Sequence, residues 1–120
     1  MEDVAAVELL RWIGKYGRFL LAGKITSDEF AANLLDKLAA APGANTDLAA
    51  EVVAALPAEA RPAVLAVVRA ALQPEFRKPA WHYGGPRQPT EAERETESAF
   101  LTERVQSWAA ALAGPLAEPR

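Results

Sequence analysis

The sequence predicts an all-α protein: a single-domain bundle of about five helices, with a long Pro- and Gly-rich loop before the last helix. Three observations lead to this fold class. Alanine, the strongest helix former, supplies 27 of the 120 residues. Apolar side chains recur at intervals of three and four residues, which is the period of one helix face. A chain of this length also buries enough surface to form one core without disulfides or metal.

The first helix is predicted over 4–22, because Glu8, Arg11, Lys15 and Arg18 fall on a single stripe and the remaining residues are apolar or small. So narrow a polar arc is typical of a helix surrounded by its neighbours. We therefore expect this helix at the centre of the fold.

Gly14 and Gly17 lie inside this first helix, where each glycine costs about 1 kcal/mol relative to alanine. Close packing of another helix, or a kink, is the first explanation. The alternative is a groove in which a ligand or partner approaches the backbone, which the missing Cβ permits. That alternative predicts a ligand cavity between these glycines and the long loop, lined by Tyr16, Trp81 and Tyr83.

The second helix has a complete start signal. Thr26 and Glu29 have the spacing of a capping box, so the helix is expected to begin at Ser27, and the Pro-Gly pair at 42–43 ends it. The turn between the first two helices is short. We therefore expect them to be antiparallel neighbours.

Two more helices complete a four-helix part at 1–72. A cap near Asn45 opens the third helix and Pro57 ends it. The fourth helix is predicted over 58–72, with its regular part starting just before Pro62, since proline fits only the first turn. The third and fourth helices are expected to form another short-linked hairpin.

A long loop is predicted at 73–89, because four prolines and two glycines there leave no helical or strand period. Long loops inside compact domains are often functional. Tryptophan, tyrosine and arginine supply much of the binding energy at protein interfaces. We therefore identify the aromatic and basic side chains of this loop as candidate partner-binding residues: Arg77, Lys78, Trp81, His82, Tyr83 and Arg87.

The last helix is predicted over 90–113, opened by a second capping box at Thr90 and Glu93 and ended by the Gly-Pro pair at 114–115. This leaves a tail at 114–120. The core stripe does not extend back into the first two turns of the helix. We expect those turns to project into solvent or against a partner.

Three aromatic residues outside the loop also carry expectations. Trp12 and Trp108 are expected in the core, with hydrogen-bond partners for their indole N–H groups. Phe100 lies off the core stripe of the last helix. It is expected to pack under the long loop, with an exposed apolar patch as the alternative.

A basic loop precedes an acidic helix. Residues 69–87 contain four basic residues and one acidic residue, whereas residues 88–104 contain two basic and five acidic residues. Either the loop aromatics anchor the loop on the bundle while the charges pair locally, or the loop is a binding epitope. Catalysis by His82 would need an orienting carboxylate and a nucleophile or oxyanion site, and the sequence identifies neither.

Composition excludes several function classes. The net charge of −3 argues against nucleic-acid binding, which needs clustered Lys and Arg. With no cysteine and one histidine, we expect no catalytic residue, no metal and no cofactor. The acidic N-terminus and the interrupted apolar stretches predict a cytoplasmic protein that neither enters nor spans a membrane.

The leading hypothesis is a non-enzymatic protein–protein interaction domain that binds a partner through the loop at 77–87 and the start of the last helix. The stretch GKITSDEF at 23–30, with the apolar helix after it, resembles small helical immunity proteins of the colicin-inhibitor kind. That resemblance implies an acidic inhibitor of a basic toxin. The alternatives are a small-molecule-binding protein and a homo-oligomer whose two-fold contact buries Phe100 and the loop.

Overall fold

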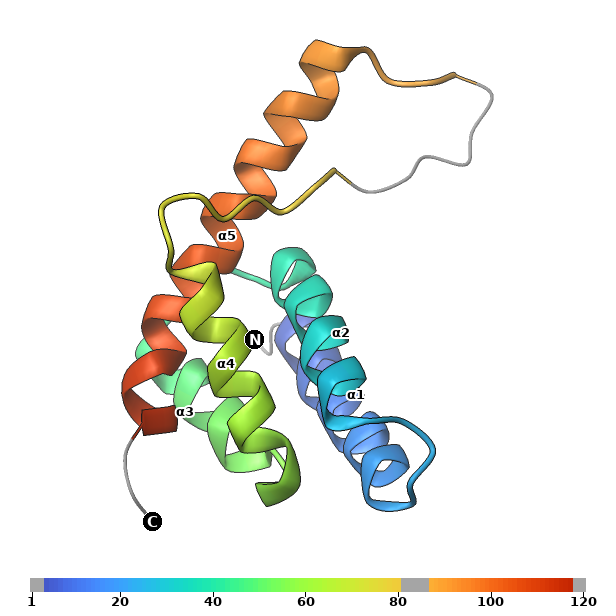
Figure 1. Cartoon of the computed structure of the whole chain (residues 1–120), viewed down its shortest axis with the longest axis vertical. Helices are drawn as coiled ribbons and strands as arrows, with labels where there is room; N and C mark the ends of the chain where they lie inside the picture. Colours follow the sequence, from blue (N-terminus) through green and yellow to red (C-terminus); the bar gives the residue numbers. More distant parts are fainter. Residues whose placement is uncertain (1–3, 81–86, 118–120) are drawn as a thin grey trace.

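The computed structural model describes residues 4–80 and 87–117, and over these residues the chain is an all-helical bundle, as predicted (Figure 1). Its overall extents are 46 × 34 × 29 Å. The described residues form five α-helices and one short 3₁₀ helix, η1: α1 (Val4–Leu21), α2 (Ser27–Ala40), α3 (Thr46–Ala55), η1 (Ala58–Ala60), α4 (Arg61–Ala71) and α5 (Glu91–Ala117).

The starts of three helices follow from local capping chemistry. At α2, the hydroxyl oxygen of Thr26 accepts the backbone N–H of Glu29 at 3.0 Å, and the Glu29 carboxylate accepts the Thr26 N–H at 3.1 Å. Thr90 and Glu93 repeat both bonds at α5, at 3.1 and 3.0 Å. At α3, the side-chain oxygen of Asn45 accepts the backbone N–H of Leu48 at 2.8 Å. Both predicted capping boxes are therefore confirmed.

The centre of the bundle is formed by α2 and α5. Helix α2 packs against α1, η1, α4 and α5, while α5 packs against α2, α3 and α4. Among the described elements, α1 packs against two helices, α2 and α3, and the three-residue η1, so the prediction that it lies at the centre is wrong. Its buried residues are Leu9, Ile13 and Gly17, and the apolar residues Val4 and Leu21 at its ends are exposed. The apolar arc of α1 is wider than the face that neighbouring helices cover.

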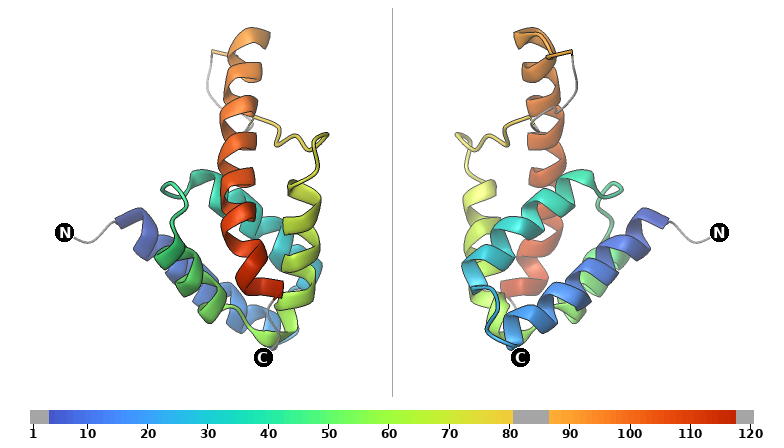
Figure 2. Two further views of the ribbon diagram at one scale, coloured as in Figure 1. Left: turned by 90° about the vertical axis from the view of Figure 1, so that its left-hand side faces the viewer. Right: turned by 90° about the vertical axis from the view of Figure 1, so that its right-hand side faces the viewer.

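Helix α5 lies between α3 and α4, which do not pack against each other, although the guanidinium of Arg61 on α4 donates a hydrogen bond to the carbonyl of Val53 on α3 at 3.5 Å (Figure 2). The predicted hairpin of the third and fourth helices is therefore wrong. A short linker limits how far apart two helices lie, but it does not make their apolar faces meet. Here both faces pack against α5, whose buried stripe is long enough to occupy them: Leu101, Val105, Trp108, Ala109, Leu112 and Leu116.

Trp108 of α5 is the largest fully buried side chain of the core. Its indole N–H donates a hydrogen bond to the backbone carbonyl of Pro42 at 3.0 Å, which confirms the expected polar partner. The guanidinium of Arg104 donates to the neighbouring carbonyl of Ala41. These two bonds hold the linker between α2 and α3 against α5.

Helix α5 continues past its predicted end. It runs through Gly114 and Pro115 to Ala117, so the prediction of a stop at 113 and a tail from 114 is wrong. Glycine and proline lower intrinsic helix stability, but Leu116 is 6% exposed and belongs to the core. The carbonyl of Pro115 also accepts a hydrogen bond from Arg61 of α4 at 3.4 Å. Tertiary contacts thus keep the last turn helical.

Candidate functional site

The first part of α5 extends beyond the bundle, and we call residues 91–100 the α5 arm (Figures 1 and 2). All side chains at 91–96 are exposed, and none in the arm is buried. The predicted projection of the first turns is therefore confirmed. Its cause lies in the sequence, because Arg94 and Glu97 occupy the positions where the buried stripe of α5 would continue.

Lys78 connects the arm to the rest of the bundle. Its backbone N–H donates to the hydroxyl of Thr102 at 2.9 Å, and its carbonyl accepts the hydroxyl of Ser98 at 2.7 Å. Its Nζ pairs with the carboxylate of Asp36 on α2 at 2.5 Å, and the Lys78 side chain is only 17% exposed. Lys78, predicted to bind a partner, thus contacts α2 and α5 of its own chain.

The other predicted loop residues are placed differently. Arg87 pairs with Glu93 at 2.9 Å, whereas Arg77 is exposed and lines a surface hollow with Glu95 of the arm. The local charge pairing considered from the sequence is therefore found for Lys78 and Arg87. Three predicted partner-binding residues lie outside the described part of the chain: Trp81, His82 and Tyr83.

The carboxylate of Glu93 has a lowered pKa. The main cause is the hydrogen bond from the backbone N–H of Thr90, followed by the Thr90 side chain and the positive charge of Arg87. Glu93 therefore keeps its negative charge at the N-terminus of α5, where the helix dipole also favours an anion.

Phe100 is 55% exposed, so the expectation that it packs under the loop is wrong. Segment 77–80 binds the side of α5 that carries Ser98 and Thr102. Phe100 is two residues from each, which places it about 200° around the helix, on the opposite side. The guanidinium carbon of Arg104 lies 5.1 Å from the centroid of the Phe100 ring. Phe100 thus forms part of the exposed surface where the arm meets the bundle.

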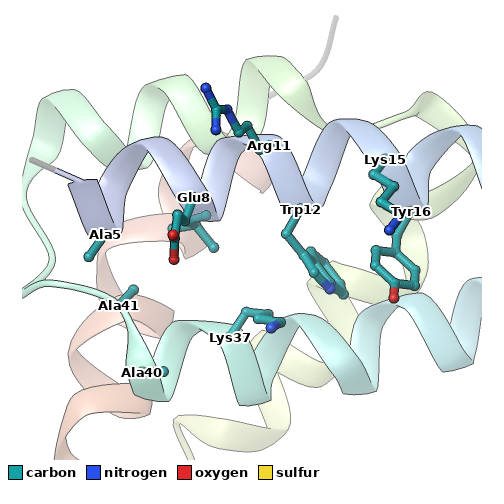
Figure 3. Close-up of a pocket in the computed structure, with 10 residues that line it drawn as sticks. Ala5, Glu8, Arg11, Trp12, Lys15, Tyr16, Lys37, Ala40 and Ala41 are labelled. Carbon is teal, nitrogen blue, oxygen red and sulfur yellow. The ribbon is translucent and has the colours of Figure 1, made fainter.

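A second candidate surface is a groove between α1 and α2, with a volume of about 480 Å³ (Figure 3). Trp12 and Tyr16 reach from α1 toward α2, and Lys37 reaches from α2 toward α1. The side chain of Arg11 points away from α2. We call this surface the α1–α2 groove and define it by its lining residues: Ala5, Glu8, Leu9, Arg11, Trp12, Lys15, Tyr16, Lys37, Ala40 and Ala41.

Aromatic rings form one wall of the α1–α2 groove. Trp12, expected in the core, is half-buried. Its ring stacks on Tyr16 with ring centroids 4.9 Å apart, and the ring centroid of Phe30 lies 5.4 Å from that of Trp12. The stacked rings contact each other, so no flat ligand fits between them. Lys15 lies 5.7 Å from the Tyr16 ring centroid and adds a cation–π contact.

The α1–α2 groove carries an excess of positive charge. Its cations are Arg11, Lys15 and Lys37, against one carboxylate, Glu8. Within residues 4–80 and 87–117, none of these four side chains forms an ion pair. Sequence analysis did not identify this groove. The available signal was the spacing of two aromatic residues beside a stripe of cations.

The two glycines of α1 have different surroundings. A Cβ on Gly17 would lie 3.0 Å from Cγ of Pro57, so Gly17 is close-packed, which was the first explanation for it. A Cβ on Gly14 would meet no atom within 4 Å. Neither glycine lines the α1–α2 groove. Within the described residues, Gly14 and Gly17 therefore do not form a common groove.

The described residues contain neither a metal-binding cluster nor a membrane-spanning helix. Among them, no group of three or more His, Cys, Asp or Glu side chains is placed to hold a metal ion. No helix formed by these residues has the length and apolar character needed to cross a membrane.

In comparisons with known proteins, no family model matches the chain, and neither the curated proteins nor the solved structures give a significant match. The candidate binding surfaces are therefore the two described above, the α5 arm with its neighbouring segment and the α1–α2 groove.

Proposed function

We propose that the protein is a non-enzymatic protein-interaction domain that binds another protein through the α5 arm and the segment at 77–87. One observation carries the proposal: the arm is a regular helix whose side chains are left unburied by the described part of the chain. A helix that projects from a bundle with no face buried presents its surface to a partner.

The arm is suited to binding because it is held in a defined position. The ion pair between Lys78 and Asp36, together with the bonds of Lys78 to Ser98 and Thr102, connects the base of the arm to α2. A binding element that is ordered before association loses less conformational entropy when it binds. This geometry favours binding of the partner by an arm that is already rigid in the free protein.

The charge of the arm favours a partner with a basic surface. The arm carries Glu91, Glu93, Glu95 and Glu97 against a single cation, Arg94. Charge complementarity accelerates association and makes binding sensitive to ionic strength. An immunity-type inhibitor of a basic toxin is the more specific form of this proposal, and the resemblance at 23–30 favours it.

The test compares three versions of the chain, in two of which the arm is unchanged. The wild-type chain, an arm variant with Glu91→Lys and Glu95→Lys, and a control with Glu51→Lys and Glu75→Lys are used to capture binding proteins from the source cells. The control changes two exposed carboxylates outside the arm and alters the net charge equally.

We expect wild type and control to capture the same partner and the arm variant to lose it. The affinity of the purified pair, measured by calorimetry, should fall as salt rises. A triple variant with Trp81→Ala, His82→Ala and Tyr83→Ala measures the contribution of the loop aromatics. Equal capture by the arm variant and the control would rule out the arm as the binding surface.

A further inference from the structure

We infer that the α1–α2 groove receives the α5 arm of a second copy of this chain, so that two copies associate by exchanging arms. The inference rests on the proposed function, because it names a partner for the same arm. The partner surface is the cationic, aromatic groove described above.

The first argument is charge complementarity between two surfaces that do not meet in one chain. Helix α5 does not contact α1, and the arm points away from both α1 and α2 (Figures 1 and 2). Glu91 and Glu95 of the arm form no ion pair within the described residues, and the same holds for Lys15 and Lys37 of the groove. A second copy brings these opposite charges together.

The second argument is the length of the two surfaces and the placement of their charges. Glu91 and Glu95 are four residues apart and lie on one side of the arm, so both can face Lys15 and Lys37 of the groove. The groove follows α1 from Ala5 to Tyr16, about 16 Å, and the ten-residue arm spans about 14 Å. The arm therefore matches the groove in length, and its two carboxylates share the side that would face Lys15 and Lys37.

The third argument is the surface that contact would cover. Trp12 and Tyr16 are half-buried, which leaves part of their rings exposed in the groove. Ala92, Thr96 and Ala99 recur at intervals of four and three residues along one side of the arm, and all three are exposed. Small side chains let two helices approach closely, so this side of the arm can lie against the aromatic rings while Glu91 and Glu95 reach the cations.

The test is a charge-swap experiment on the full chain. The arm variant carries Glu91→Lys and Glu95→Lys, the groove variant carries Lys15→Glu and Lys37→Glu, and Glu51→Lys with Glu75→Lys is the control. All six positions are exposed, so the variants should fold, and circular dichroism checks this. Mass is measured by light scattering and sedimentation over a concentration series at low and high salt.

We expect wild type and control to form a dimer at low salt that dissociates on dilution and as salt rises. Each reversal should raise the dimer dissociation constant by roughly tenfold or more, because several pairs change from attractive to repulsive. An equimolar mixture of the two variants should dimerise again. In the mixed dimer, each exchanged arm meets a groove of opposite charge.

Three results would overturn the inference: a monomer at every concentration at low salt, a dimer that neither reversal weakens, or a mixture that stays monomeric. A wild-type monomer, combined with an arm variant that fails to capture another protein, would overturn the self-association and leave the proposed function standing. Equal capture by the arm variant and its control, with a dimer that the swap restores, would leave a homodimer and remove the separate partner.

Discussion

The two halves of α5 are one continuous helix with opposite environments. From Leu101 to Leu116 the helix contributes the long buried stripe that separates α3 from α4, whereas no side chain of the α5 arm is buried. The difference shows that helix formation and core burial are separate requirements. The stability of the bundle depends on one half, whereas the side chains of the other half stay outside the core.

The arm stays helical without tertiary burial for two local reasons. The capping box of Thr90 and Glu93 satisfies backbone groups at its N-terminus. The buried half of α5 also supplies the helical turns onto which the arm extends, so the arm needs no nucleus of its own.

The largest expected effect lies in the buried half. Trp108→Ala should lower the free energy of unfolding by about 3–5 kcal/mol, because it removes the largest core side chain and its bond to Pro42. Urea unfolding followed by circular dichroism measures this change. A loss below about 1 kcal/mol would show that the buried half does not carry the stability assigned to it.

The next effect concerns the base of the arm. Ser98→Ala combined with Thr102→Val removes both hydrogen bonds to the backbone of Lys78. We expect a loss of about 1–2 kcal/mol and faster amide hydrogen exchange at 91–100. Ser107→Ala, an exposed change on the same helix, is the control. Unchanged exchange in the arm would mean that Lys78 does not hold it.

A third prediction compares Phe100 and Leu101, which lie on either side of the boundary between the α5 arm and the buried half of α5. Phe100→Ala should change the free energy of unfolding by less than about 0.5 kcal/mol, since the ring is mostly exposed. Leu101→Ala, at a buried position, should cost about 2–5 kcal/mol. Similar costs in urea unfolding would contradict the boundary between the two halves.

The smallest effect is a pH dependence of the arm. The pKa of Glu93 is lowered in the folded chain, chiefly by the Thr90 backbone N–H. The stabilisation is therefore present above the ordinary value of 4.5 and is lost as the pH falls through the lowered pKa. A carboxyl NMR titration measures that pKa, and Glu93→Gln should remove the dependence. A pKa at or above 4.5 would contradict the capping role.

Local chemistry explains which parts of the fold were predictable. The starts of α2 and α5 depend on two pairs, Thr26 with Glu29 and Thr90 with Glu93. The residues of each pair are three positions apart, so sequence spacing was sufficient. The end of α5 was not predictable in this way. Gly114 and Pro115 are local stop signals, but burial of Leu116 outweighs them.

The candidate site was predicted only in part. The projecting arm follows from Arg94 and Glu97, which interrupt the apolar stripe. The internal roles of Lys78 and Arg87 depend on where Asp36 and Glu93 lie in space. The α1–α2 groove was missed because an aromatic residue at helical spacing has the same sequence pattern whether it is buried or half-buried.

The sequence by itself determined the all-helical class, the starts of the capped helices and the polarity of the arm, because these depend on residue type and on interactions a few positions apart. The tertiary structure decided that α2 and α5 form the centre, that α5 separates α3 from α4, and that α1 leaves Trp12 beside an open groove. Such choices depend on which apolar faces meet, and apolar contact is non-directional, so a local pattern does not specify its partner.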